Sequence, residues 1–136
     1  MDYEKIAEEL LKLRAQLLQV PEYQKVREFS RGEFFVLNNL LTHTGTAYPK
    51  DLSREMRVSS ARVAALLNQT ERKGWTVRGA DVEDNRQTRI TITQEGRVEI
   101  AERKAAVFEL GVEMLKKIGP DDADERLRIK RKILDK

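Results

Sequence analysis

The sequence predicts a mostly helical protein with one small β-hairpin. The hairpin is indicated by a polar stretch, residues 79–87, between two short runs, residues 74–78 and 88–93. In each run apolar residues stand two apart, which is the period of a β-strand. A helical segment, residues 59–73, comes directly before the hairpin, and a shorter helix that begins near Pro49 precedes it. This order of helix, turn, helix and hairpin is that of a winged helix-turn-helix.

The segment before this core is predicted to be an amphipathic helix. Over roughly residues 3–20, apolar side chains recur in steps of three and four, which places them on one helical face. Pro21 is expected to end or bend that helix. Further on, Ser30 and Glu33 have the spacing of a capping box, so the next helix is expected to begin there.

The segment after the hairpin is predicted to form a helical dimerisation region. Thr93 is expected to cap the longest helix, which runs to about residue 118, and a last helix follows over roughly residues 121–134. Apolar positions recur in the long helix like a coiled-coil seam, with more apolar surface than one small domain can bury. A second copy of the chain is therefore expected to cover it. The residues predicted at this dimer interface are Ile6, Leu10, Leu13, Leu17, Val98, Ala105, Phe108, Val112, Leu115, Leu127 and Ile133.

The helix that Ser59 should cap has an unusual outward face. Its inward face is predicted to carry Val63, Leu66, Leu67 and Thr70. The outward residues are Ser60, Ala61, Arg62, Ala65, Asn68 and Gln69. These side chains are mostly small or hydrogen-bonding, the kind that can approach base edges in a DNA groove. Arg62 suits guanine O6 and N7, with a phosphate contact or plain solvent exposure as the open alternatives.

The hairpin tip contributes a second candidate contact. Arg86 could enter a minor groove, where narrow A·T-rich DNA concentrates negative potential, and its alternative is a solvated loop arginine. Asp84 is expected to pair with Arg86 or Arg78 and so support the wing, or else to be a solvated turn residue.

The positive charge of the chain is concentrated in this region. The net charge is +3, and residues 48–93 hold nine Lys/Arg against six Asp/Glu, so that the remainder, with 17 of each sign, is neutral. A polyanionic partner would need the surplus there. The cations that flank the motif as candidate phosphate contacts are Lys50, Arg54, Arg72 and Lys73.

Residues 34–100 resemble the multiple-antibiotic-resistance regulator (MarR) family of bacterial transcription factors. The matching strings are Phe34-Phe35-Val36-Leu37-Asn38-Asn39-Leu40, Asp51-Leu52, Val58-Ser59-Ser60-Ala61-Arg62-Val63, Glu71-Arg72-Lys73-Gly74, Arg78, Asp84-Asn85-Arg86 and Thr93-Gln94-Glu95-Gly96. The resemblance implies a homodimer that binds a pseudo-palindromic operator in double-stranded DNA. It also implies a repressor that a small-molecule effector releases.

Two residues depart from the family pattern. Ala65 stands where many members carry arginine, which removes a phosphate or base contact. Arg57 stands where many carry glycine, which predicts a non-glycine residue in a strained turn. With the resemblance in view, the expected domains are an N-terminal helix for dimerisation (residues 1–30), a DNA-binding domain (31–93) and C-terminal dimerisation helices (94–136).

Other functions find little support in the residues present. The chain has no cysteine and one histidine, His43, so neither a thiolate nucleophile nor the usual zinc ligand set can form. We see no catalytic motif and expect no enzyme activity and no cofactor. No signal peptide or membrane-spanning run is visible, which predicts a cytoplasmic protein without a membrane partner. The alternative function is a winged-helix assembly subunit, whose basic face would meet an acidic protein.

Overall fold

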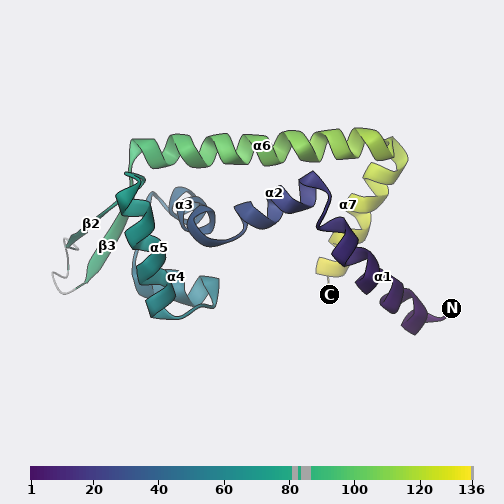
Figure 1. The fold of residues 1–136 in the computed structure, drawn as a ribbon, viewed down its shortest axis with the longest axis horizontal. Helices are drawn as coiled ribbons and strands as arrows, with labels where there is room; N and C mark the ends of the chain where they lie inside the picture. The colour runs from purple at the N-terminus through teal and green to yellow at the C-terminus, as the bar shows by residue number, and fades with distance from the viewer. Residues whose placement is uncertain (81–82, 84–86, 136) are drawn as a thin grey trace. The chain divides into compact units, whose positions relative to one another are not determined.

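The computed structural model describes residues 1–80, 83 and 87–135 (Figure 1). The helices are α1 (Tyr3–Leu17), α2 (Pro21–Phe29), α3 (Gly32–Thr42), α4 (Pro49–Met56), α5 (Ser60–Arg72), α6 (Gln94–Ile118) and α7 (Pro120–Leu134). The strands are β1 (Thr46–Ala47), β2 (Thr76–Ala80) and β3 (Thr88–Ile92), which form an antiparallel sheet in the order β1-β3-β2. The predicted class, mostly helical with a small β-hairpin, is confirmed.

The chain forms two compact units. We call residues 27–104 the winged unit, and residues 1–26 with 105–136 the terminal unit. α3, α4, α5 and the three strands all belong to the winged unit, whereas α1 and α7 belong to the terminal unit.

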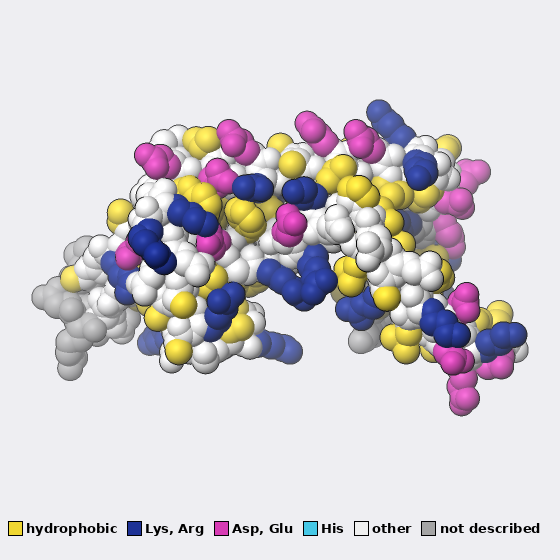
Figure 2. Space-filling view, in the orientation of Figure 1, with side chains coloured by type: hydrophobic (Ala, Val, Ile, Leu, Met, Phe, Trp, Pro, Cys, Tyr) yellow, Lys and Arg dark blue, Asp and Glu magenta, His cyan; other side chains and the backbone are white. Residues whose placement is uncertain are grey.

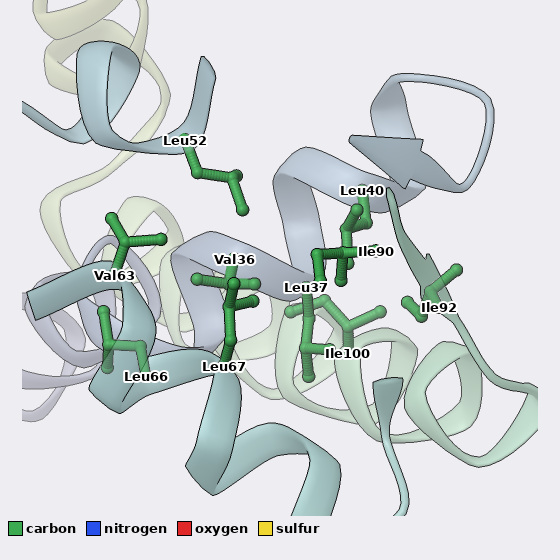
Figure 3. Close-up of a cluster of buried hydrophobic side chains, with 10 residues drawn as sticks. All are labelled: Val36, Leu37, Leu40, Leu52, Val63, Leu66, Leu67, Ile90, Ile92 and Ile100. Atoms are coloured by element: carbon green, nitrogen blue, oxygen red, sulfur yellow. The ribbon is translucent and has the colours of Figure 1, made fainter. Parts of the chain in front are cut away.

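A single apolar core holds the winged unit together (Figure 3). It draws on α3, α4, α5, β3 and the start of α6, and its members are Val36, Leu37, Leu40, Leu52, Val63, Leu66, Leu67, Ile90, Ile92 and Ile100. Full burial of one such side chain stabilises the fold by about 1.5–3 kcal/mol. The predicted inward face of α5 is confirmed, because all of its members, including Thr70, are buried.

Two of the three predicted helix caps are confirmed. The Ser59 hydroxyl accepts from the backbone N–H of Arg62 at 3.1 Å, and the Thr93 hydroxyl accepts from that of Gly96 at 3.0 Å. The capping box at Ser30 is wrong, because α3 begins at Gly32 and its cap residue makes no side-chain bond. The Glu33 carboxylate instead accepts from the Lys73 ammonium with both oxygens. Two charge-assisted bonds outweigh the single bond that the Glu33 side chain would make in a capping box.

Some elements differ from the sequence prediction. The first helix ends at Leu17 rather than Val20, and Pro21 begins the additional helix α2, where its fixed φ suits a first helical position. In β2 the apolar alternation does not set the buried face, because Val77 is 53% exposed and Thr76 only 2%. Thr76 tolerates burial because its hydroxyl lies 2.8 Å from that of Thr70.

Two backbone positions constrain the winged unit. Arg57 follows α4 in the left-handed region, at φ 57° and ψ 43°. This is the strained turn that was predicted because arginine stands where many family members carry glycine, and it costs about 1–2 kcal/mol. Gly96 lies so close to the preceding loop that an added Cβ would stand 2.3 Å from the Trp75 carbonyl oxygen. Only glycine fits this approach of α6 to the start of the hairpin.

The terminal unit leaves much apolar surface uncovered. No described residue of α1 or α7 is buried, and Figure 2 shows apolar side chains at the surface of this unit. Inside the unit, Glu22 accepts from Arg126 at 3.3 Å, and the Arg126 guanidinium lies 5.8 Å from the Tyr23 ring centre. Among the helices that the structure describes, none combines the length and apolar character needed to cross a membrane.

Candidate DNA-binding surface

The outward face of α5 is a narrow stripe of mostly small side chains. Ala61, Ala65, Asn68 and Arg72 follow one another in steps of four, three and four, so they lie along one line of the helix. All four are exposed, as are Ser59 and Ser60 at the start of the helix. Because the two alanines end at Cβ, Asn68 is the first hydrogen-bonding side chain on this line. The predicted contact Gln69 is partly buried beside it.

Arg62 lies at the edge of this face rather than on its centre line. It is exposed, and a pocket of about 320 Å³ opens beside it. The pocket is lined by Ser30, Arg31, Gly32, Phe35, Glu55, Met56, Val58, Arg62 and Leu66. A guanidinium on a flexible stem can still reach a base or a phosphate from this edge.

A polar network ties α5 to the hairpin strand β2. Arg78 donates from Nε to Glu71 Oε1 at 2.8 Å and from a terminal nitrogen to Asn68 Oδ1 at 2.5 Å. The predicted partner Asp84 and the predicted groove contact Arg86 lie outside the described residues. Among the described residues, Arg78 therefore supports the wing through α5. The sequence does contain a signal for this pairing, since Glu71 is the one carboxylate in α5.

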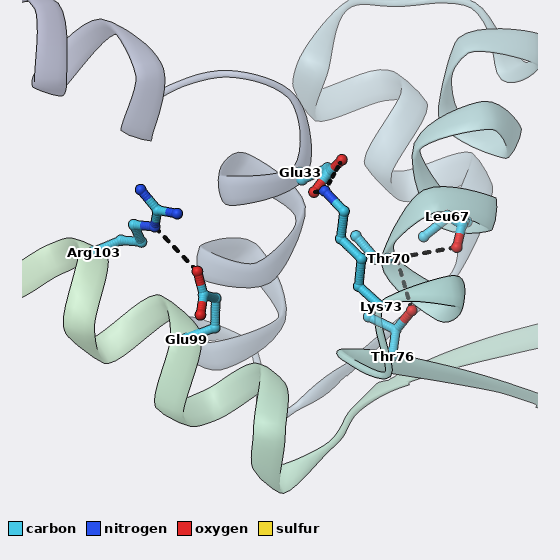
Figure 4. Close-up of polar contacts among 7 residues, drawn as sticks. All are labelled: Glu33, Leu67, Thr70, Lys73, Thr76, Glu99 and Arg103. Atoms are coloured by element: carbon cyan, nitrogen blue, oxygen red, sulfur yellow. Dashed lines mark hydrogen bonds and ion pairs between the residues drawn. The ribbon is translucent and has the colours of Figure 1, made fainter.

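A second, buried bridge joins the same two elements (Figure 4). The Thr70 hydroxyl donates to the Leu67 carbonyl at 3.1 Å and shares a hydrogen bond with the Thr76 hydroxyl at 2.8 Å. Since both threonines are buried, this pair fixes the base of the hairpin against the C-terminal end of α5. Side-chain hydrogen bonds thus join α5 and β2 at two places, one exposed and one buried.

The flanking cations differ in their surroundings. Lys73 donates to the two oxygens of Glu33 at 2.9 and 2.7 Å and lies 4.8 Å from the Trp75 ring centre, so it braces α5 against α3 (Figure 4). Arg54 forms an ion pair with Asp51 one helical turn earlier. Lys50 and Arg72 are both exposed. A cation already paired within the protein must exchange partners before it binds a phosphate, which lowers its net contribution.

His43 lies at the C-terminal end of α3. Its Nδ1 donates to the Asn39 carbonyl at 2.8 Å, and the side chain is exposed. Within residues 1–80, 83 and 87–135, no group of three or more His, Cys, Asp or Glu side chains is arranged to hold a metal ion. Among the described residues, the contacts of His43 are therefore those of an ordinary residue at a helix end.

Comparison with known proteins gives the fold a family context. No family model matches the chain. It is 33% identical over 86 residues to YdgJ of Bacillus subtilis (strain 168), an uncharacterized HTH-type transcriptional regulator; the match spans 63% of this chain and 52% of YdgJ. The crystal structure of YusO from Bacillus subtilis superposes with a TM-score of 0.78 at 20% identity, over 98% of this chain and 97% of YusO.

MepR, a transcription regulator of the Staphylococcus aureus multidrug efflux pump MepA, gives a TM-score of 0.75 at 17% identity and covers 98% of this chain and 97% of its own. This chain has the fold of the MarR regulators. The resemblance predicted from the sequence is thereby confirmed, and both MepR and YdgJ are described as transcription regulators. A mutant of MepR was solved bound to an oligodeoxyribonucleotide, and it superposes with a TM-score of 0.63 at 19% identity over 94% of each chain.

Within the MarR fold, the departure at Ala65 can now be located. Ala65 is exposed on the centre line of α5, one turn before Asn68. An arginine at this position would extend beyond its neighbours and supply most of the hydrogen-bond donors on this face. With alanine in its place, hydrogen bonding on that line depends on Asn68 and Arg72.

Proposed function

We propose that this chain is a homodimeric, sequence-specific DNA-binding regulator of transcription, with α5 as its recognition helix. The observation that carries the proposal is the exposed line of small and hydrogen-bonding side chains on α5, held to the wing by Arg78. Small residues allow the helix backbone to approach the floor of a major groove, and the amide and guanidinium groups can then bond to base edges. The fold of DNA-binding regulators supports the same assignment.

The proposed contacts divide into two kinds. Base edges would be read by Ser60, Arg62, Asn68 and Gln69, with Ala61 and Ala65 giving room, while Ser59, Lys50 and Arg72 would bind phosphates. Arg86 remains proposed as a minor-groove contact on the strength of the sequence. The surplus positive charge of residues 48–93 supports binding to a polyanion.

The dimer in this proposal is formed through the terminal unit and α6. Nine of the eleven predicted interface residues are large apolar side chains that the single chain leaves exposed; Ala105 is exposed as well, and Val112 is partly buried. A two-fold dimer would place two copies of α5 about 34–36 Å apart, one turn of DNA, and so match a pseudo-palindromic operator. Action as a repressor, release by a small-molecule effector and a place in the cytoplasm are proposed from the resemblance to the MarR family.

The first test is binding to duplex DNA. We expect the purified protein to bind random duplex weakly, with an affinity that falls steeply as salt rises, because each neutralised phosphate releases counterions. It should bind a site in the DNA next to its own gene more tightly, by about 10³-fold or more. Fluorescence anisotropy at several salt concentrations measures both quantities. If no duplex bound at low salt, the protein-interaction alternative would replace this proposal.

A second test separates the edge of the recognition helix from the wing. Arg62→Ala should cost about 1–3 kcal/mol per base contact and relax the preference at one symmetric operator position. Arg86→Ala should instead weaken binding to all sequences and reduce the salt slope, because it removes one cationic contact per subunit. Anisotropy titrations of both variants against single-base operator variants distinguish these effects.

Each variant serves as the control for the other, because both lose one arginine. An unchanged base preference in Arg62→Ala would make Arg62 a phosphate contact. An unchanged affinity of Arg86→Ala at every salt concentration would remove the wing tip from the DNA interface.

A further inference from the structure

We propose that Arg78 sets the base that Asn68 reads, by occupying the amide oxygen and leaving only the amide NH₂ for the DNA. Asn68 would then recognise guanine rather than adenine. This inference rests on the proposed function, because it specifies one contact of the recognition helix. The sequence predicts Arg78 only as a support of the wing and Asn68 only as one of several outward residues. It does not predict that the two act together.

The orientation of the Asn68 amide follows from the chemistry of its partner. A guanidinium carries only donors, so the atom of Asn68 that faces Arg78 must be the oxygen, the one acceptor on that side chain. The terminal nitrogen of Arg78 lies 2.5 Å from Asn68 Oδ1. Rotating the amide by half a turn would set NH₂ against guanidinium, two donors without an acceptor, so the arrangement has a single favourable orientation.

Arg78 is itself held in place. Its Nε donates to Glu71 at 2.8 Å, and this contact joins Arg78 to α5 as well as to its own strand. The backbone beneath it is fixed by the pairing of Arg78 with Ile90 in β3 and by the buried Thr70–Thr76 bond. A fork-shaped group anchored at one nitrogen presents the other in a defined direction. The wing strand therefore controls the amide on the recognition helix.

Base recognition by asparagine depends on which amide atoms are available. An asparagine selects adenine by accepting from the N6 amino group while it donates to N7, which requires a free oxygen. With Arg78 on that oxygen, the adenine amino group would have to approach beside a cationic guanidinium, and the two donors would repel. The free NH₂ of Asn68 matches atoms that only accept. Guanine offers two of these, O6 and N7, and the nearby positive charge of Arg78 favours their negative edge.

The neighbours of Asn68 leave this contact unobstructed. Ala65, one turn earlier on the same line of α5, ends at Cβ and cannot compete for the base edge. Asn68 is exposed despite its bond to Arg78, so its NH₂ remains accessible. A single base position in each half-site should thus depend on the Asn68–Arg78 pair.

The test compares base preference with and without Arg78. Asn68→Ala first identifies the operator position that Asn68 reads, as the position where this variant loses discrimination. At that position the wild-type protein should prefer guanine over adenine. Arg78→Met, which keeps an apolar stem but no donor, should free the oxygen and lower the guanine-over-adenine ratio by about fivefold or more. Anisotropy competition among the four operator variants measures this ratio.

Three further variants make the result specific. Arg72→Met removes the same charge from the same face and should weaken binding to all four operators equally. Arg78→Lys retains a donor and should keep most of the guanine preference. Arg78→Met combined with Asn68→Ala should show no preference at this position. Thermal melting followed by circular dichroism verifies that each variant is folded.

Several outcomes would overturn the inference while leaving the proposed function intact. These are an adenine preference in the wild-type protein, an unchanged guanine preference in Arg78→Met, or no position at which Asn68→Ala loses discrimination. Failure of the wild-type protein to prefer any sequence over random duplex would instead overturn the proposed function itself.

Discussion

Replacing both Phe108 and Val112 with glutamate should give a monomer that no longer binds operator DNA measurably. Phe108 is 71% exposed in the single chain, and Val112 lies one helical turn along the same side of α6. Each unpaired carboxylate that is buried in an apolar interface costs several kcal/mol of desolvation free energy. Two of them in each subunit should therefore prevent the dimer from forming. Sedimentation at micromolar concentration should give about twice 15.8 kDa for the wild-type protein and a single copy for this variant.

The matched control places the same change in charge on the other side of α6. Ala106→Glu with Lys117→Gln also lowers the net charge by two, and both positions are exposed. This variant should remain a dimer and bind the operator with affinity close to that of the wild-type protein. A dimeric Phe108→Glu, Val112→Glu protein would show that the interface lies elsewhere.

The second large effect is expected for Gly96→Ala. The new methyl group would lie 2.3 Å from the Trp75 carbonyl oxygen and 2.9 Å from a side-chain carbon of Ile92. The carbonyl cannot move freely, because it accepts from the backbone N–H of Thr93 at 2.9 Å. Such overpacking costs up to about 3 kcal/mol, so the midpoint of urea unfolding should fall markedly.

Gly79→Ala is the control for this substitution. Gly79 belongs to the same unit, is exposed in β2 and has nothing within 4 Å of an added Cβ, so stability should change by no more than about 0.5 kcal/mol. Equal unfolding midpoints for the two alanine variants would contradict the close approach of α6 to the hairpin.

Much of the fold follows from local patterns in the sequence. The inward face of α5 and the caps at Ser59 and Thr93 were predictable, because periodic burial and the demands of a helix start act over a few residues. Contacts between distant segments decided the rest. Ser30 does not cap α3, which begins at Gly32, and Glu33 bonds to a lysine 40 residues away. β1, with only two residues, is too short to give a pattern.

The candidate site divides in the same way. The exposure of the α5 face was predictable from helical periodicity. That Arg62 stands at its edge beside a pocket, and that the Asn68 oxygen is taken by Arg78, depends on how α4 and β2 pack against α5. Which donors and acceptors stay available at a proposed base contact depends on tertiary packing, so the order of residue types along the chain does not reveal it.

The pairing of β1 with β3 has a consequence for how the winged unit folds. Thr46 pairs with Thr91, and the Arg89 guanidinium donates to the Thr46 hydroxyl at 2.9 Å, so these contacts close a loop that contains α4, α5 and β2. Closing a loop of this length costs chain entropy. The packing of the elements inside the loop must offset that cost, so these elements stabilise one another. Helix α5 should therefore gain and lose structure together with β2 and β3, as one cooperative unit, rather than fray alone.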